Sequence, residues 1–455
     1  MKVSRQFIYH VRRSLPSLRF EDQQMTSFGG LVVFEALFQR LGVKKRWSCC
    51  CGHLRQACSY SAAAIVELLV VHVLLGYRRL RDIELYREDP MVLRLLGLKR
   101  LPDVSIVSRA LRAMDGAVVE GLRAHLRELV IQRLVSSGLR TITLDFDGSV
   151  QSTRRKAEGT AVGFNNKRKG ARSYYPLLCT VAQTGQVFDV LFRSGNVHDS
   201  NGALDFAVEC IEKIWALRPG VRIEVRMDGA FFQEEMVTVL DSMGVELSMS
   251  VPFSRFAALK KRIENRRRWK RLGQGRDGFE LKWKPKSWPW RYRFIVVRKR
   301  VVERYKGPLQ LDLFEPVSDR YEYKVLVTSK RGNLRKVVAF HEGRGSQEGV
   351  IGELKSQAAM DYVPVRTWRG NQVYLLCGLL AHNLGRELQM QSDQPVRRCS
   401  ENRSALWCFE HLDSLRKRWI QRAARLTRPA GKLTLTFGTN QAVEYRLTRM
   451  LAAFL

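Results

Sequence analysis

The chain has 455 residues, of which 45% are hydrophobic, 9% are aromatic and 27% are charged. This composition excludes wholesale disorder, and nine cysteines in a chain of this length exclude a secreted disulfide scaffold. The 78 Lys and Arg residues outnumber the 44 Asp and Glu residues, which gives a net charge of +34. A chain this basic is expected to bind a polyanion, and nucleic acid is expected before an anionic membrane.

The sequence predicts neither a membrane span nor a secretion signal. The longest apolar stretch, Ala62–Leu75, is interrupted by Glu67 and His72 and is too short to cross a bilayer. The basic residues near the N-terminus are not followed by an apolar stretch. The expected location is therefore the cytoplasm, where DNA is accessible and the cysteines are reduced.

A cluster of cysteines raises the question of a zinc site. The cluster consists of Cys49, Cys50, Cys51, His53 and Cys58. Zinc modules usually have a second pair of ligands a dozen or more residues away, and no such pair follows here. Reduced, partly buried thiols are the favoured interpretation.

The first 135 residues are predicted to be helical because apolar residues recur at spacings of three and four. The expected helices are Phe28–Leu41, Ser61–Gly76, Asp103–Met114 and Val118–Ser136. The segment Leu101–Met114, with Arg109 and Arg112 on its polar side, is either the second helix of a helix-turn-helix motif or an ordinary amphipathic helix.

From Leu139 onward the pattern predicts an α/β fold. The expected strands are Thr141–Asp147, Leu177–Ala182, Val187–Phe192, Val221–Met227 and Val245–Val251, and the expected helices are Ser200–Leu217 and Phe231–Met243. Three strands in a meander, followed by strands that alternate with helices, indicate a mixed sheet covered by helices.

Residues 252–320 interrupt this pattern with a strongly basic segment. Between Lys260 and Lys306 there are 19 Lys and Arg residues and four acidic residues, with several tryptophans among them. Because strands are expected at Tyr292–Val302 and Tyr321–Thr328, the segment is predicted to be an inserted β-rich subdomain rather than a disordered tail. Further helices are expected at Gln347–Met360, Asn371–Met390 and Leu412–Arg428.

Three acidic residues stand out in this basic chain. Asp147 and Asp228 each end a predicted strand, and each is followed by Gly, which lets the backbone turn and leaves the carboxylate accessible. An Asp alone at such a place is usually a turn or cap residue, but the matched pair favours a site for divalent cations. The third acid is Glu348, near the start of the predicted helix Gln347–Met360. Arg344 and Lys355 lie on either side of it and are placed to hold phosphates. Three carboxylates holding two Mg²⁺ ions suit phosphodiester cleavage.

These motifs resemble those of the DDE transposases of bacterial insertion sequences. Arg344, Glu348 and Lys355 have the spacing of a signature in which a Tyr stands three residues before the Arg, and His341 takes the place of that Tyr. Asp147 opens the sequence Asp-Gly-Ser, which is typical of the first strand of an RNase H-like core. Three further stretches resemble the insertion-sequence thirteen-eighty family: GFNNKRKGARSYYPL, RSGNVHDS and RGSQEGVIGELK.

The resemblance implies a catalytic site and its cofactor. Asp147, Asp228 and Glu348 would bind two Mg²⁺ ions, for which Mn²⁺ would substitute. The enzyme would cut the ends of its element and join the resulting 3′-OH to target DNA, acting as a homodimer on paired DNA ends in the bacterial cytoplasm, associated with the nucleoid when active. Asp145 is the alternative to Asp147, and Glu353 is the alternative to Glu348.

The implied DNA contacts are spread over the chain. Trp288 or Trp290 would stack on a base flipped out of the DNA, although packing inside the subdomain is an equal alternative. The full set of expected DNA-binding residues is Arg344, Lys355, His341, Trp288, Trp290, Arg109, Arg112, Arg168 and Lys169. Asp199, next to His198, is either a further acid near the site or a helix N-cap, and a helix N-cap explains it adequately.

The expected organisation has an RNase H-like mixed sheet as its centre. The predicted parts are a helical DNA-binding region (1–138), the first part of the core (139–252), the basic β-rich insertion (253–330), the second part of the core (331–392) and a basic C-terminal region (393–455). Two other functions remain open at this point: an RNase H-like nuclease that does not transpose, and a domesticated DNA-binding protein.

Overall fold

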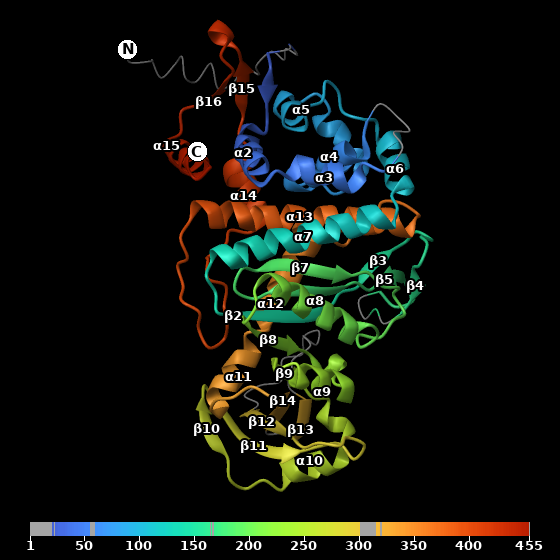
Figure 1. Cartoon of the computed structure of the whole chain (residues 1–455), viewed down its shortest axis with the longest axis vertical. Coiled ribbons are helices and arrows are strands. Elements are labelled where there is room, and N and C mark those ends of the chain that lie inside the picture. The colour runs from blue at the N-terminus through green and yellow to red at the C-terminus, as the bar shows by residue number, and fades with distance from the viewer. Residues whose placement is uncertain are drawn as a thin grey trace, which may run out of the picture.

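The computed structural model describes residues 21, 23–54, 60–163, 165, 168–300, 315–318 (backbone only) and 321–454. The molecule is elongated, with helices at one end, a mixed sheet in the middle and a β-rich part at the other end (Figure 1). Within these residues, no helix combines the length and the apolar character needed to span a membrane.

The described residues of the N-terminal part are mainly helical, as predicted, and they include the two-residue strand β1 (Met25–Thr26). Its elements are η1 (Gly29–Leu31), α2 (Val32–Leu41), α3 (Val43–Cys51), α4 (Ala62–Leu74), η2 (Leu80–Tyr86), α5 (Pro90–Leu96), α6 (Val104–Ala113) and α7 (Gly116–Ser136). Asp103 begins α6 by accepting a hydrogen bond from the Ser105 amide at 2.8 Å. The apolar helix α4 is buried along most of its length and packs against α13 (Trp368–Ser392), so segments distant in sequence share one core.

The central sheet has the topology of an RNase H-like core. Its strands are β2 (Thr141–Gly148), β6 (Leu177–Val181), β7 (Gln186–Leu191), β8 (Arg222–Met227) and β9 (Glu246–Ser250), in the order β7-β6-β2-β8-β9. The first three strands in sequence pair antiparallel, whereas β8 is parallel to β2 and β9 is parallel to β8. Helices α8 (Ala203–Leu217) and α9 (Glu234–Ser242) provide the crossovers. The predicted fold class is confirmed.

The alternating pattern of β2 gives the sheet two different faces. Ile142, Leu144 and Phe146 pack into the apolar core beneath α8 and α9. Thr143 and Asp145 face the other way, where they lie opposite polar residues of β8 and are nevertheless buried. The polar side chains on this second face are therefore buried, and they need hydrogen-bond partners within the protein.

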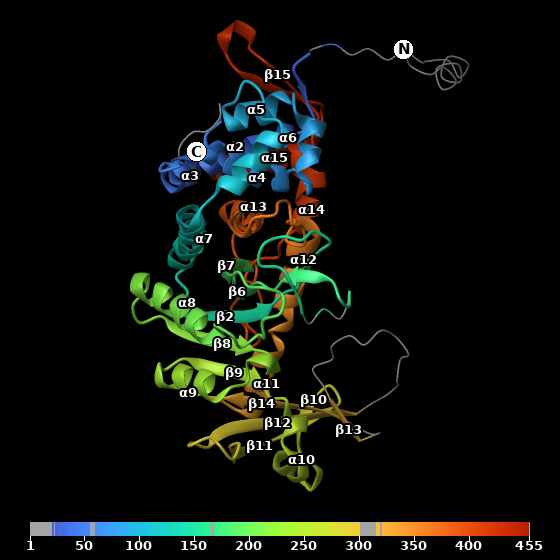
Figure 2. The ribbon, with the colours of Figure 1, turned by 90° about the vertical axis from the view of Figure 1, so that its right-hand side faces the viewer.

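The basic segment continues the core sheet. Its elements are η4 (Phe253–Arg255), α10 (Ala257–Glu264), β10 (Lys270–Gly273), β11 (Arg276–Trp283), β12 (Tyr292–Arg300), β13 (Glu315–Ser318) and β14 (Tyr321–Thr328). Because β14 pairs antiparallel with β9, the inserted strands and the core strands form one ten-stranded sheet. The strands follow one another along the long axis of the molecule (Figure 2).

Two further helices return the chain to the core, and α13 crosses between the sheet and the N-terminal helices. The helices are α11 (Leu334–Glu342) and α12 (Gly345–Gln357), which precede α13. Figure 2 shows α13 between these two parts of the molecule. The segment from α11 to α12 lies close to the ends of β2 and β8 and therefore decides the geometry of the site described below.

The prediction of one basic helix over Leu412–Arg428 is wrong beyond Ile420. The chain forms α14 (Leu412–Leu415) and a π-helical turn, η5 (Arg416–Ile420), and then a hairpin of β15 (Ala424–Thr427) and β16 (Thr434–Phe437) with the turn η6 (Pro429–Gly431) between them, before α15 (Gln441–Ala452). Strand β15 pairs with β1 from the other end of the chain. Helical periodicity cannot reveal such a long-range pairing partner.

A close backbone approach near this junction can be tested by substitution. A Cβ at Gly30 would overlap the carbonyl oxygen of Trp419 in η5, whereas a Cβ at Gly352, on the exposed side of α12, would meet nothing within 4 Å. We expect Gly30→Ala to lower the free energy of unfolding by about 1–3 kcal/mol and Gly352→Ala to leave it unchanged or raise it slightly, because Ala favours helix. Denaturant unfolding measures both, and equal stability of the two variants would contradict the close approach.

Candidate active site

Two carboxylates meet at one end of the central sheet because β2 and β8 run parallel and adjacent. Asp147 is the penultimate residue of β2, and Asp228 directly follows β8. The register pairs Asp145 with Arg226. Two residues further along each strand, on the same face of the sheet, are Asp147 and Asp228. Asp228 also begins the short helix η3 (Gly229–Phe231) by accepting a hydrogen bond from the Ala230 amide at 2.9 Å, which fixes the orientation of its carboxylate.

Helix α12 adds a third acid and an arginine. The nearly buried Arg344 guanidinium lies 3.5 Å from Asp147 Oδ2 (Nη1) and 3.6 Å from Glu348 Oε1 (Nη2). The Glu348 side chain is 60% exposed, whereas that of Asp147 is 21% exposed. The structure therefore brings the three predicted acids to one region, with Arg344 between two of them.

The carboxylates of this region repel one another. Burial raises the pKa of Asp147 to about 7, Arg344 opposes this shift, and the negative charges of Asp228, Asp199 and Glu348 add to it. Burial also raises the pKa of Asp228, again opposed by Arg344. Neighbouring acids with raised pKa values are typical of functional sites, and an additional cation would stabilise the charged forms of Asp147 and Asp228.

The donor set fits a hard divalent cation by its chemistry, because carboxylate oxygens are the ligands that Mg²⁺ and Mn²⁺ prefer. Across the described ranges, however, no three His, Cys, Asp or Glu side chains are close enough together to hold a metal ion. Arg344 supplies the positive charge between Asp147 and Glu348 instead. The exposed Glu348 side chain leaves room for a change of rotamer.

A fourth acid, Asp199, also lies beside this group, and the expectation that it is a helix N-cap is wrong. Helix α8 is capped by Gly202. A Cβ at Gly148 would clash with the Asp199 carboxylate and the Tyr175 hydroxyl, so the glycine after Asp147 is required for this close approach. The sequence signals for Asp199 are its place in the stretch RSGNVHDS and its position next to His198, which allow an acid near the site.

The two alternative acids are engaged inside the protein. Asp145 accepts two hydrogen bonds from Arg226, at 2.5 and 2.7 Å. Glu353 is buried, forms an ion pair with Arg386 at 2.5 Å and accepts a hydrogen bond from the Leu412 amide. The structure therefore places Asp147 and Glu348, rather than these alternatives, at the open end of the sheet.

The structure buries two of the residues expected to contact DNA, and for Trp288 it favours the alternative of packing inside the insertion. His341 is completely buried and hydrogen-bonds with the hydroxyls of Ser248 and Ser250, each at 3.0 Å. Burial also holds its pKa well below the usual value, so the ring is neutral. Trp288 is 6% exposed and stacks on Phe232 with ring centroids 4.9 Å apart. Both side chains pack in the interior, and their burial depends on contacts with residues distant in the sequence.

The remaining expected contacts differ in exposure. Trp290 is 66% exposed. Four basic residues are also exposed: Arg109 and Arg112 on α6, and Arg168 and Lys169 in the loop before β5 (Arg172–Tyr174). Lys355 is half-buried on α12 and already takes part in an interaction.

The described cysteines of the cluster differ in how deeply they are buried. Cys49 is exposed, Cys50 is half-buried and Cys51 is buried, while Cys58 lies outside the described residues. Burial raises the pKa of Cys51 to about 12, which disfavours the thiolate that zinc requires. His53 lies 2.7 Å from Asp115.

Comparison with known proteins identifies the family. The chain is similar to a solved piggyBac transposase synaptic complex with hairpin DNA, at 12% identity and a TM-score of 0.44, with 78% of this chain and 74% of that chain covered. It is also similar to the Mos1 transposase paired-end complex with left transposon end and to the Mos1 mariner paired end complex with Mn, each at 14% identity with 43% of this chain and 60% of that chain covered, at TM-scores of 0.18 and 0.17. Curated proteins gave no match. The family model described as Transposase DDE domain group 1 matches residues 11–454, and the chain therefore belongs to this transposase family.

Proposed function

We propose that this protein is a DNA transposase of a bacterial insertion sequence of the thirteen-eighty family. It binds the terminal inverted repeats of its element and catalyses cleavage and strand transfer of DNA. The observation that carries the proposal is the meeting of Asp147 and Asp228 at the ends of adjacent parallel strands, with Arg344 and Glu348 facing them from α12. Family membership adds independent support.

The residues that would hold divalent cations are Asp147, Asp228 and Glu348. Two Mg²⁺ ions, or Mn²⁺ in their place, would stabilise the attacking and leaving oxygens of the phosphodiester reaction. The chain itself orients the Asp228 carboxylate through the Ala230 amide and balances the charge of Asp147 through Arg344. Arg344, the N-cap residue of α12, and Lys355, on the same helix as Glu348, would bind the phosphates of DNA placed at this edge.

Exposed basic residues would bind the rest of the DNA. Those of α6 (Arg109 and Arg112), the loop with Arg168 and Lys169, and the inserted segment provide positive charge at several places along the molecule. The exposed Trp290 suits stacking on an unpaired base. We further propose that two copies act together on paired DNA ends in the bacterial cytoplasm, close to the nucleoid.

The reaction products distinguish this function from a nuclease. A transposase with labelled end DNA and a divalent cation yields nicked or hairpin ends and then strand-transfer products. Cleavage of any DNA without strand transfer would favour an RNase H-like nuclease, and end binding without cleavage would favour a domesticated DNA-binding protein.

The role of the third acid can be tested with a matched control. We expect Glu348→Gln to reduce end cleavage by at least about 100-fold, as removal of an essential catalytic interaction does, while binding of end DNA changes little. Glu235→Gln, which replaces an exposed Glu in the first turn of α9, is expected to cleave like the parent. Gel assays of cleavage and binding measure both properties, and normal cleavage by Glu348→Gln would refute the assignment.

The raised pKa of Asp147 predicts a dependence of stability on pH. With a folded pKa of about 7 and an unfolded pKa of about 3.9, the folded state favours the protonated form. The charged carboxylate therefore destabilises the fold fully above pH 7 and not at all below about pH 4. We expect Asp147→Asn to raise the melting temperature at pH 8 and to have little effect at pH 4.

The same variant tests cation binding without an activity assay. Added Mg²⁺ or Mn²⁺ should raise the melting temperature of the parent protein at pH 8, because a cation that binds only the folded state stabilises it. This gain should be smaller for Asp147→Asn. An equal gain in both proteins would place cation binding elsewhere.

The two tryptophans of the insertion should respond differently to substitution. Trp290→Ala is expected to weaken binding to DNA with unpaired bases by about 1–3 kcal/mol without a change in melting temperature. Trp288→Ala should lower stability by about 3–5 kcal/mol, because it removes a buried ring. Fluorescence anisotropy with single-stranded and duplex DNA, together with thermal melting, measures both, and unaltered DNA binding by Trp290→Ala would assign that ring no role in DNA contact.

A further inference from the structure

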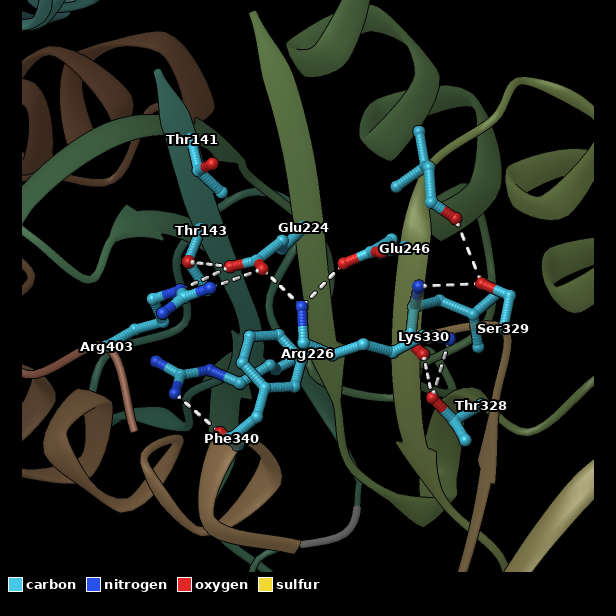
Figure 3. Close-up of polar contacts among 12 residues, drawn as sticks. Thr141, Thr143, Glu224, Arg226, Glu246, Thr328, Ser329, Lys330, Phe340 and Arg403 are labelled. Carbon is cyan, nitrogen blue, oxygen red and sulfur yellow. Dashed lines mark hydrogen bonds and ion pairs between the residues drawn. The ribbon is translucent and has the colours of Figure 1, made fainter. Parts of the chain in front are cut away.

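The polar face shared by β2 and β8 contains buried charges for which the proposed reaction has no direct use. Thr143 lies opposite Glu224 and Asp145 lies opposite Arg226, and all four side chains are almost completely buried. Figure 3 shows Glu224 with Thr143, Lys330 and Arg403, and Arg226 with Phe340. Buried charges are costly unless they are paired and hydrogen-bonded, so the partners of these groups indicate what the charges do.

The guanidinium of Arg226 joins three separate parts of the chain. Nε and Nη2 donate to the two carboxylate oxygens of Asp145 on β2, at 2.5 and 2.7 Å. Nη1 donates to the carbonyl oxygen of Phe340 in α11 at 2.8 Å and to that of Asn402 in the C-terminal segment at 2.9 Å. Arg226 also precedes Asp228 by two positions on the same face of the strand.

This hydrogen-bonded group lies directly under the start of α12. Gly343, in the turn between α11 and α12, packs so closely that a Cβ there would overlap both the Asn402 carbonyl and the Arg226 guanidinium. From the first turn of α12, the side-chain Nε2 of Gln347 donates to the backbone carbonyl of Asp145 at 2.8 Å. Residues on both sides of Arg344 are thereby held against Asp145 and Arg226.

A second charged cluster fixes the neighbouring part of the C-terminal segment. Arg403 donates to both carboxylate oxygens of Glu224, at 2.7 and 2.8 Å, and Thr143 and Lys330 also bind this carboxylate. Lys330 in turn forms an ion pair with Glu246 at 2.5 Å (Figure 3). The position of Asn402, and so of its carbonyl at Arg226, is therefore set by the rigid core.

Stability alone is a poor reason for such an arrangement. Burial raises the pKa of Asp145 even though Arg226 opposes the shift, and a buried ion pair often contributes no more to stability than well-packed apolar residues would. The directions of its hydrogen bonds, however, impose one geometry on the groups that share them.

We propose that Arg226 is a positioning residue that orients the start of α12, so that Arg344 and Glu348 face Asp147 and Asp228. It acts through Asp145, the Phe340 carbonyl and the Asn402 carbonyl and does not touch DNA or metal. The effect on cleavage rests on the proposed function, whereas the effect on the order of α12 does not.

The test compares Arg226→Met with Arg133→Met. Arg133 donates to both carboxylate oxygens of the buried Glu387, at 3.0 and 2.5 Å, and this pair joins α7 to α13. Hydrogen exchange of residues 340–357, DNA affinity, melting temperature and single-turnover cleavage at saturating end DNA are measured for both. We expect Arg226→Met to exchange faster in 340–357 and to cleave about 100-fold more slowly, as a misplacement of about 1 Å would cause, with DNA affinity within about threefold of the parent.

The control and the conservative variant decide between positioning and general stability. Arg133→Met is expected to keep normal exchange in 340–357 and normal cleavage, even if its melting temperature falls as far as that of Arg226→Met. Arg226→Lys, which keeps the charge but not the planar set of donors, is expected to give intermediate exchange and intermediate cleavage, and it serves as the test variant where Arg226→Met does not fold.

Two results would overturn the inference. One is unaltered exchange in 340–357 in the Arg226 variants. The other is a loss of cleavage in Arg133→Met as large as that in Arg226→Met when the two variants lose the same stability. Absence of cleavage by the parent protein would refute the proposed function instead, and the exchange comparison would then decide the role of Arg226 by itself.

Discussion

The parallel pairing of β2 with β8 is the constraint on which the rest of the site depends. Its register places Asp145 opposite Arg226 and brings Asp147 and Asp228 together where the two strands end. The apolar residues on one face of these strands hold them against α8 and α9, which leaves the other face to charged and polar groups. The same pairing that forms the sheet therefore also creates a buried ionic interior and, at its open end, a group of acids.

The charges of the chain are distributed unevenly between its basic surface and the end of the sheet. The chain has a net charge of +34, yet acids that repel one another gather at one end of the sheet, where burial and mutual repulsion raise the pKa of Asp147 to about 7. Basic residues dominate the strands inserted after β9, which extend the same sheet. A polyanion drawn to the basic surface would meet this group of acids, which favours cations, and the ion pair of Asp145 with Arg226 keeps α12 close to it.

Several features of the site could be predicted because they depend on local patterns. Alternation identified β2, a Gly after each acid located Asp147 and Asp228, and the spacing of Arg344 and Glu348 identified the helix that faces them. The predictions failed where burial decides the location of a side chain or where long-range strand pairing decides the secondary structure. Ring stacking with Phe232 removes Trp288 from the surface, because two tryptophans separated by a single residue look alike until the surrounding fold covers one of them.

The sequence by itself determined the class of fold and the order of the core elements, and it indicated Asp147, Asp228 and Glu348 as candidate acids, because strand alternation, helix periodicity and Asp-Gly turns are local properties of the chain. Only the tertiary structure decided which charged groups face one another. It buried His341 between two serine hydroxyls, placed Asp199 beside Asp147, and directed Arg226 to carbonyl groups of α11 and of the C-terminal segment. These contacts join residues that lie far apart in the chain, and their geometry is set by packing and hydrogen bonding in three dimensions, which sequence spacing does not encode.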